Sequence, residues 1–490
     1  MPRSRLCVCV LCAAAGLALA LGLLALAAAP AVAQAPPKKP VSFINEVAPI
    51  LKENCFACHN AKKRKGKFEM TTFETLRKGG GDDPVTAGRP EDSDLFRRIT
   101  TTGARRMPPK DEGEPLARDQ AAVIRQWIQE GAKLDAGLEA QADLMRELRL
   151  RWKPPAPKPV YDRPVIVTAL AFTPDNKQLV VGGQHELTVW DVAGGKLEKR
   201  IATRAERAKA MVFLPDGKLA VAGSRPGQEG DVRIYNLQGG TPKVVNGVPM
   251  LDGVHDKTVM VKELLETDDE VLCLAVSADG KKLASGGCDR LVCVWDLSAG
   301  YANAKLEQTI ENHADWVLGV VFSPDGQKLL TASRDKTAKM WDLKTKESVL
   351  TFPDHQNGVF GVAIKSDGKI AASVGQDNQV RYWNATADGK QIRASGGHGM
   401  EIYKVIWHPK LPILVTCSAD KTVRIWNPDS GAQVHTLSGH TDYVYGLALS
   451  SDGKLVASGS WNGEVKIWNV ADGKVVKEFN ASPGLPVVRK

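Results

Sequence analysis

The chain has 490 residues, of which 43% are hydrophobic and 25% are charged, and its formal net charge is +9. This length predicts two or more domains, and the hydrophobic fraction is sufficient for folded cores. The positive charge is mild and spread along the chain, and no basic helix with base-reading residues stands out, so the composition does not demand a nucleic-acid partner and we expect none.

The N-terminus has the pattern of a secretory signal. Arg3 and Arg5 precede an apolar stretch over 6–29, and Ala31-Val32-Ala33 offers a small-residue cleavage site. We therefore expect residues 1–33 to be a signal peptide and the mature protein to be exported, into the bacterial periplasm or cell envelope. The apolar stretch is also long enough to span a bilayer, so membrane anchoring by an uncleaved signal is the alternative.

A five-residue run, Cys55-Phe56-Ala57-Cys58-His59, is the C-x-x-C-H signature of covalent haem attachment. It predicts one haem c bonded through the thioethers of Cys55 and Cys58, with His59 as the proximal ligand of the iron. A structural zinc site would need four ligands, and no other Cys or His occurs between Ala33 and His185. A redox C-x-x-C would stand in a βαβ pattern, and none is visible here.

The other axial ligand is predicted to be Met107, which is followed by two prolines that fix the backbone of its loop. A thioether ligand raises the reduction potential and suits electron transfer. Met70 is the rival ligand, although it follows His59 so closely that we expect it on the proximal side. An open or water-ligated iron is the third possibility.

Two apolar stripes with helical spacing flank this motif. The first leads into Cys55, and the second ends near Gly131. They comprise Phe43, Val47, Ile50 and Leu51, and then Ala121, Ile124, Trp127 and Ile128. We therefore expect a small all-α c-type cytochrome domain over 41–134, with the haem supplying much of its core.

The same region resembles the planctomycete-type cytochrome c domain. The resemblance rests on the haem motif, on Met107-Pro108-Pro109 and on Trp127-Ile128 followed by Gly131-Ala132, which occur in the family's order. It implies a single haem c, with the motif His59 as proximal ligand and Met107 at the position of the distal ligand. It implies a cofactor and no particular reaction.

A basic run over 62–67 follows the haem motif. Such a run could steer an acidic redox partner to the haem edge. A solvated loop without a partner is the interpretation that we favour, because charge runs are usually exposed surface. Next, the stretch 138–152 has the pattern of a charged amphipathic helix, and the Pro-rich stretch 153–159 should be an extended spacer, so that 135–160 joins two domains.

The remainder of the chain repeats itself. A Trp or Tyr followed by Asp or Asn recurs at spacings of 45, 60, 46, 42, 43 and 42 residues, which is typical of WD repeats. The aromatic positions are Trp190, Tyr235, Trp295, Trp341, Trp383, Trp426 and Trp468. Seven units predict an all-β, seven-bladed propeller over 161–480, with an insertion near 239–257 in the second blade. The segment 474–479 should supply the last blade's own outer strand.

Four histidines precede inner strands of the later repeats, and WD-repeat proteins hold such a histidine in a buried network with Ser or Thr, Asp and Trp. The predicted sets are His313, Ser333, Asp335 and Trp341; His398, Ser418, Asp420 and Trp426; and His440, Ser460 and Trp468 with Asn462 in place of Asp. His355 would face Gly375 instead of a serine, and the first three repeats lack the histidine. We interpret these sets as structural and not as catalytic triads.

These features favour an exported electron-transfer protein whose propeller is a scaffold for protein interactions. Its expected partners are a redox protein and a protein bound to a propeller face. The alternatives are a haem-based sensor or assembly module, and a propeller enzyme that uses the haem as an electron relay. The propeller shows no catalytic constellation, so the sequence favours a non-enzymatic role.

Overall fold

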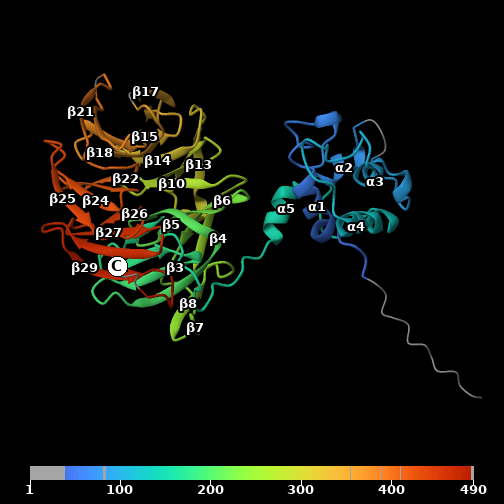
Figure 1. The fold of residues 1–490 in the computed structure, drawn as a ribbon, viewed down its shortest axis with the longest axis horizontal. Coiled ribbons are helices and arrows are strands. Elements are labelled where there is room, and N and C mark those ends of the chain that lie inside the picture. The colour runs from blue at the N-terminus through green and yellow to red at the C-terminus, as the bar shows by residue number, and fades with distance from the viewer. Residues whose placement is uncertain (1–38, 81–83, 354, 387, 409, 487–490) are drawn as a thin grey trace, which may run out of the picture. The chain divides into compact units, whose positions relative to one another are not determined.

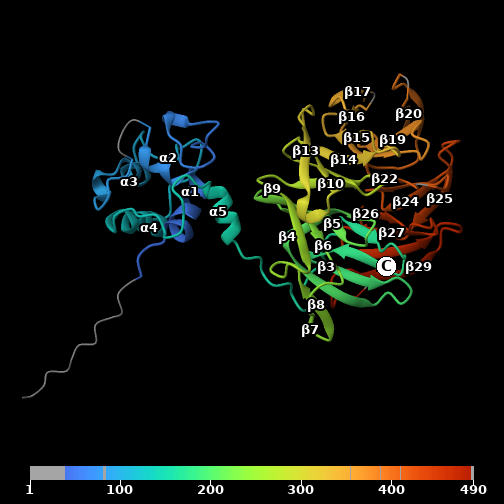
Figure 2. The ribbon, with the colours of Figure 1, turned by 180° about the vertical axis from the view of Figure 1, so that it is seen from behind.

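The structure is a computed structural model, which describes residues 39–80, 84–353, 355–386, 388–408 and 410–486. The chain divides after Trp152 into two compact units, one helical and one built of β-sheets (Figures 1 and 2). The predicted signal peptide, residues 1–33, lies outside the described residues. Within the described ranges, no helix combines the length and the apolar character needed to span a membrane.

Over its described residues, the helical unit contains a π-helical turn, short 3-10 turns and five α-helices. The π-turn is η1 (Phe43–Val47), and the 3-10 turns are η2 (Lys65–Lys67) and η3 (Pro90–Asp92). The α-helices are α1 (Ala48–Asn54), α2 (Phe73–Lys78), α3 (Asp94–Thr100), α4 (Arg118–Gln129) and α5 (Leu144–Arg151).

The two predicted helical stripes form the centre of this unit. The first stripe spans η1 and α1, and the second lies on α4. Phe43 packs against Trp127 with a ring-centroid distance of 5.2 Å, and against Phe73 at 4.9 Å. These contacts hold the N-terminal and C-terminal helices of the unit together, and both predicted helical segments are confirmed.

Helix α5 is shorter than the sequence pattern predicts. It begins at Leu144 and not near residue 138, because the Asp143 side chain accepts the backbone N–H of Arg146 at 3.0 Å and caps the helix there. Leu144 is buried in the same apolar core as Trp127. After α5, residues 153–159 form neither helix nor strand, as expected of a Pro-rich spacer.

In the part of the β unit that the structure describes, there are six hydrogen-bonded sheets. Five have four consecutive antiparallel strands each: β10 (Val271–Val276) to β13 (Lys305–Ile310), β14 (Val317–Phe322) to β17 (Glu347–Phe352), β18 (Val359–Ile364) to β21 (Gln391–Ser395), β22 (Ile402–Trp407) to β25 (Gln433–Ser438), and β26 (Val444–Leu449) to β29 (Val475–Asn480). Their middle strands are β11 (Lys282–Gly287), β12 (Val292–Asp296), β15 (Lys328–Ser333), β16 (Ala338–Asp342), β19 (Ile370–Gly375), β20 (Val380–Asn384), β23 (Leu414–Ser418), β24 (Thr422–Trp426), β27 (Leu455–Ser460) and β28 (Glu464–Asn469).

The sixth sheet has nine strands and contains the first two repeats. Its strands are β1 (Leu170–Phe172), β2 (Gln178–Gly182), β3 (Gln184–Asp191), β4 (Leu197–Phe213), β5 (Leu219–Arg225), β6 (Glu229–Tyr235), β7 (Lys243–Val245), β8 (Val248–Asp252) and β9 (Met260–Thr267).

The sequence predicts seven sheets, and the structure has six because β4 is continuous across two repeats. The first part of this 17-residue strand pairs with β3, and its last part pairs with β5. The predicted insertion forms the β7–β8 hairpin, and β8 adds to β4 as a parallel strand. The insertion therefore extends the sheet at this point.

The last sheet is complete without the N-terminal end of the repeat region, because β29 pairs with β28 as its outer strand. The first and last sheets meet through other contacts. Val167 N–H donates to the Ser460 carbonyl at 3.1 Å, and Trp190 stacks on Phe479 with ring centroids 4.2 Å apart. The prediction that the last repeat supplies its own outer strand is confirmed.

Candidate functional site

The C-x-x-C-H motif begins where α1 ends. The backbone turns tightly after the helix, because Cys58 N–H and His59 N–H both donate to the Cys55 carbonyl, at 3.1 and 3.0 Å. Cys55 is buried, whereas Cys58 and His59 are half-buried. The turn thus gathers the two thiols and the imidazole over five residues.

These three side chains line a cavity of about 620 Å³ in the helical unit. The same cavity is lined by Met70 and Met107. Its volume lies within the range of roughly 300–1,000 Å³ that is usual for small-molecule and cofactor sites. Every residue that the sequence singled out for haem attachment and ligation, together with the rival Met70, therefore lies around one cavity.

His59 is held in the tautomer that a metal ligand requires. Its Nδ1 lies 3.3 Å from the Phe68 carbonyl oxygen, which can only accept a hydrogen bond. Nδ1 therefore carries the proton, and Nε2 keeps its lone pair free for a metal. The Phe68 ring also lies beside the imidazole, with centroids 5.5 Å apart, and limits its rotation.

The two methionines reach the cavity from different segments. Met70 is fully buried, and its N–H donates to the His59 carbonyl at 2.8 Å, so it is a direct neighbour of the motif. Met107 lies in the loop after α3, and its N–H donates to the Arg98 carbonyl at 2.9 Å. This placement agrees with the interpretation of Met70 as a residue on the side of His59, and Met107 as distal ligand stays a prediction.

Glu112 is a cavity residue that the sequence did not reveal. Cys58 Sγ donates to its Oε2 at 3.2 Å, and Lys65 forms an ion pair with the same carboxylate. The hydrogen bond to Glu112 raises the pKa of the Cys58 thiol, and burial raises the pKa of Cys55 to about 12. Both cysteines are therefore protonated thiols at neutral pH. No sequence signal links Glu112 to the motif, because the two are 54 residues apart.

The residues present fit a covalently bound haem. Two thiols, an imidazole with a free Nε2 and a thioether face one cavity of suitable volume. Among the described residues, no group of three or more His, Cys, Asp or Glu side chains is arranged to hold a bare metal ion.

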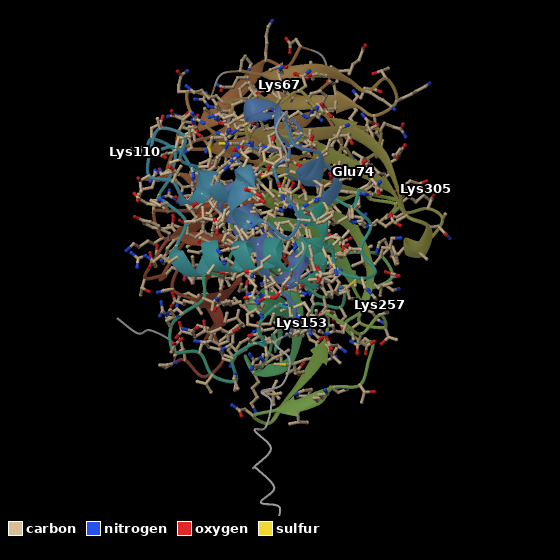
Figure 3. The ribbon with its side chains drawn as sticks, turned by 90° about the vertical axis from the view of Figure 1, so that its right-hand side faces the viewer. Lys67, Glu74, Lys110, Lys153, Lys257 and Lys305 are labelled. Atoms are coloured by element: carbon tan, nitrogen blue, oxygen red, sulfur yellow. The ribbon has the colours of Figure 1, made fainter. Side chains whose placement is uncertain are left out.

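The basic run over 62–67 is exposed along its whole length. Lys67 at its end is labelled in Figure 3, and two of its neighbours form ion pairs: Arg64 with Glu69 at 2.7 Å, and Lys65 with Glu112. The run is a solvated loop that borders the cavity through Lys65.

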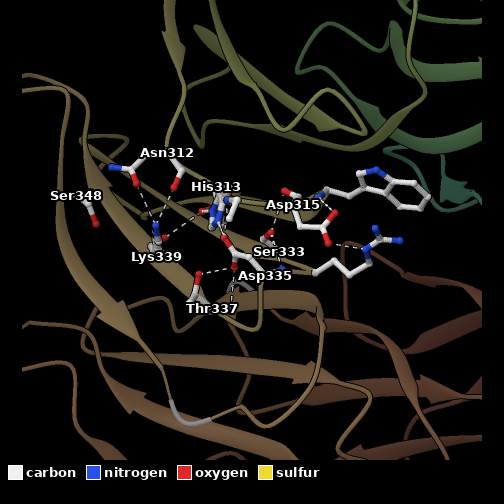
Figure 4. Close-up of polar contacts among 12 residues, drawn as sticks. Asn312, His313, Asp315, Ser333, Asp335, Thr337, Lys339 and Ser348 are labelled. Atoms are coloured by element: carbon white, nitrogen blue, oxygen red, sulfur yellow. Dashed lines mark hydrogen bonds and ion pairs between the residues drawn. The ribbon is translucent and has the colours of Figure 1, made fainter.

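The histidine networks of the β unit are real, but each uses a different hydroxyl from the one predicted. His313 Nδ1–H donates to Asp335 at 2.8 Å, while its Nε2 lies 2.7 Å from Thr331 Oγ1 (Figure 4). Trp341 Nε1–H donates to the same hydroxyl at 2.9 Å. Ser333 instead donates to the Asp315 carbonyl.

The same shift of two residues applies to the other networks. His355, His398 and His440 contact Ser373, Thr416 and Ser458 at 2.6, 2.8 and 2.6 Å, respectively. Ser418, Ser460 and Gly375, which the sequence suggested, are not the hydroxyl positions. The hydroxyl that contacts the histidine belongs to a residue within the second strand, such as Thr331 in β15. Ser333 lies two residues further on, at the end of that strand.

The last sheet also has a different acid. His440 Nδ1–H donates to Glu464 at 3.0 Å, so Glu464 takes the role that Asn462 leaves open. Glu464 is two residues further along and has a longer side chain, which lets its carboxylate reach the same imidazole nitrogen. All four histidines are thus bonded at both ring nitrogens, as expected of structural residues.

The first repeat has a buried ion pair near its edge. Arg200 binds Glu186 through two hydrogen bonds, at 2.6 and 2.9 Å, and both side chains are buried. Tyr161 donates to the same carboxylate at 2.6 Å. Arg200 also donates to the carbonyls of Lys158 and Pro159, at 2.6 and 3.3 Å, and so fixes the end of the spacer to the sheet.

Comparison with known families matches both parts of the chain. The model described as "Planctomycete cytochrome C" matches residues 55–111. The model described as "WD domain, G-beta repeat" matches six segments: 160–191, 256–296, 304–342, 346–384, 389–427 and 431–469.

Several curated proteins are similar to parts of the β unit. A coronin-like protein of Saccharomyces cerevisiae is 32% identical over 98 residues, 20% of this chain and 15% of the relative. The apoptotic protease-activating factor 1 of Rattus norvegicus is 48% identical over 59 residues, 12% of this chain and 5% of the relative. The small ribosomal subunit protein RACK1y of Oryza sativa subsp. japonica is 33% identical over 79 residues, 13% of this chain and 24% of the relative.

Each of these matches therefore spans less than a quarter of the relative's own length. The family matches fall on the two parts of the chain that carry the haem motif and the repeats. The chain is a fusion of a planctomycete cytochrome C domain with a region of WD repeats.

Proposed function

We propose that this protein is an exported mono-haem c-type cytochrome that transfers electrons, with its WD-repeat region acting as a scaffold for a protein partner. The observation that carries the proposal is the single cavity shared by Cys55, Cys58, His59 and Met107. When bound there, a haem c would accept and donate single electrons.

The chain's own residues have separate roles in this proposal. The thiols of Cys55 and Cys58 hold the group covalently, so that it stays attached in a dilute compartment outside the cytosol. His59 offers Nε2 from one side because the Phe68 carbonyl fixes its tautomer. Met107 supplies a thioether from the loop after α3, which favours the reduced state and a higher potential.

The edge of the cavity near Cys58 is open to a redox partner. Ala57, Lys65 and Glu112 line the cavity and are exposed. Electrons can therefore be exchanged at this edge without opening the fold. The ion pair between Lys65 and Glu112 borders the same edge, and it links the basic loop to the segment that follows Met107.

The WD repeats support the role of an interaction scaffold. We further propose that they close into seven blades, with β4 shared between the first two. Loops at one end of the sheets carry exposed apolar side chains: Trp316, Met400, Tyr443 and Trp461. Three of these precede an inner strand and the fourth follows a second strand, so the antiparallel topology places them at the same end. This end is the face that we assign to the partner.

Haem attachment is tested by expressing the full chain together with a bacterial export and haem-attachment system. The purified protein should keep a haem stain after denaturation, and the double variant Cys55→Ser, Cys58→Ser should lose it. Cys288→Ser is the matched control, because Cys288 lies in the WD-repeat region and should leave the stain unchanged. A colourless wild-type protein from cells that mature another c-type cytochrome would refute the electron-transfer proposal.

Exposure to carbon monoxide separates the proposed function from a sensor. A reduced iron held by both His59 and Met107 should not bind carbon monoxide and should give a reversible titration. Rapid carbon monoxide binding by the native protein would indicate an open position and favour the sensor.

A further inference from the structure

The centre of the WD-repeat region holds a second cavity, of about 170 Å³, between the innermost strands of its sheets. Most side chains that line it are apolar, such as Leu272, Leu318 and Val362, and backbone groups contribute polar surface between them. Lys404 is the one charged residue among those that line it.

Lys404 occupies a position where the other sheets have small residues. The inner strands β4, β10, β14, β18, β22 and β26 each have a register shift at the same place. The residue that follows the shift lines the cavity in all of them but β26, where the next residue does. The residues that follow the shift are Ala210, Cys273, Gly319, Gly361, Lys404 and Gly446. The strands approach closely here, since a Cβ added to Gly319 would lie 3.2 Å from the Cα of Gly361. One long cationic side chain thus enters a space that its counterparts leave free.

The ammonium group reaches across this space. Lys404 Nζ donates to the Thr168 carbonyl at 2.7 Å. The bond joins the sheet of β22 to the sheet of β1, and the sheet of β26 packs between them. Among the described residues, no second acceptor lies within hydrogen-bond distance of Nζ and no carboxylate lies within 4.0 Å. An ammonium group has three donors, so two of them have no protein partner in the described part of the chain.

The neighbouring ionisable groups cannot supply the missing charge. They are the thiols of Cys273 and Cys417, and burial raises the pKa of each to about 12. Both are neutral at physiological pH. Burial also lowers the pKa of Lys404, which expresses the same cost of an isolated cation. Lys404 is half-buried, and charges that proteins hold away from bulk water are normally paired, so this site lacks a counter-ion.

We propose that the central cavity binds one small carboxylate anion, of about the size of acetate, with Lys404 as its cationic partner. The space suits such a ligand, because about 170 Å³ corresponds to roughly six water molecules at ~30 Å³ each. The apolar side chains accept a short hydrocarbon group, while a dianion such as sulfate would leave its second charge without a cationic partner, because Lys404 is the one charged residue in the lining. The proposal does not depend on haem.

The test is a thermal unfolding titration of the full-length protein with sodium acetate. Ionic strength is kept constant with a bulky sulfonate that is too large for the cavity. The wild-type protein should show a saturable rise in Tm, because a ligand that binds only the folded state stabilises it. Lys404→Met should abolish this rise.

Lys209→Met is the matched control. Lys209 lies at the register shift of β4, but it already has a carboxylate partner in Glu270 at 2.8 Å, so its variant should keep the acetate response. Should Lys404→Met fail to fold, saturation-transfer NMR of the acetate methyl group on wild-type protein decides the matter. Absence of saturable binding to the wild type, or a decrease in affinity of less than about tenfold in Lys404→Met, would overturn the proposal.

Discussion

At the scale of single residues, His59 shows how a short motif depends on a distant backbone group. The sequence predicts that the imidazole is a ligand, but only the fold places the Phe68 carbonyl 3.3 Å from Nδ1. That contact selects the nitrogen that remains free. The two methionines show the opposite situation. Both line the cavity, so the cavity alone does not distinguish them. Their backbone hydrogen bonds do, because Met70 N–H donates to His59 and Met107 N–H donates to Arg98.

Replacing each methionine tests this separation. Met107→Ala should let the reduced protein bind carbon monoxide and should lower the reduction potential by on the order of 0.1 V, because a thioether ligand is lost. Met70→Ala is the control, since it removes a buried side chain of similar size and should change the potential less. Potentiometric titration and carbon monoxide spectra measure both effects. A larger loss of potential in Met70→Ala would assign ligation to Met70.

At the scale of an element, the second strand of a repeat carries the hydroxyl that joins histidine to tryptophan. Thr331 and Ser373 fill this position in neighbouring sheets. Each accepts the indole N–H and lies against the histidine Nε2, so loss of the hydroxyl leaves two buried groups unpaired. The element therefore requires a hydroxyl and accepts either residue.

Thr331→Val should lower the free energy of unfolding by about 1–3 kcal/mol, since the variant keeps the shape but leaves Trp341 N–H and His313 Nε2 without a partner. Thr331→Ser should cost distinctly less, because Ser373 performs the same role in the next sheet. Urea denaturation followed by circular dichroism provides the values. Equal losses in the two variants would argue against the hydroxyl as the joining group.

Sequence reasoning located the elements but not the exact partners. The recurrence of Trp with Asp or Asn predicted the repeats, and alternation of side chains along a strand could not tell Thr331 from Ser333 because both point to the same face. In the same way, the motif predicted Cys58 as an attachment site but not its hydrogen bond to Glu112. That contact forms only because the fold brings together two residues 54 positions apart in the chain. Local patterns are visible in a sequence, and long-range contacts of single side chains are not.

At the scale of the whole molecule, the buried histidines link stability to pH. Burial lowers the pKa of His398 and His440, although the acids beside them act in the opposite direction. An unfolded histidine takes up its proton near pH 6.5, so the unfolded state binds protons first as the pH falls. Stability is therefore fully present above about pH 6.5 and declines below it.

A fall from pH 7 to pH 5 should therefore reduce the free energy of unfolding of the WD-repeat region, by at most about 1.4 kcal/mol per pH unit for each histidine. A second loss should follow below about pH 4, because Asp377 has a pKa lowered to about 2. Burial, the largest single effect, raises this pKa, but the hydrogen bonds and charges of His355 and Arg381 together outweigh it. Denaturation curves at several pH values measure this. The double variant His398→Gln, His440→Gln should flatten the first decline, and an unchanged slope would contradict the assignment.

The hydrogen bonds of Arg200 to the spacer determine where a stable fragment of the repeat region can begin. Because Arg200 donates to the carbonyls of Lys158 and Pro159, those residues complete the first sheet although they carry no strand. A fragment that starts at residue 164 would leave guanidinium donors without acceptors in a dry interior, and would also lose Tyr161. A fragment that starts at residue 153 should therefore have a distinctly higher melting temperature than one that starts at residue 164. Similar melting temperatures would show that residues 153–163 are dispensable for the stability of the sheet. The N-terminal boundary of the folded repeat region therefore lies at the residues that Arg200 binds, Lys158 and Pro159, and not at the first strand.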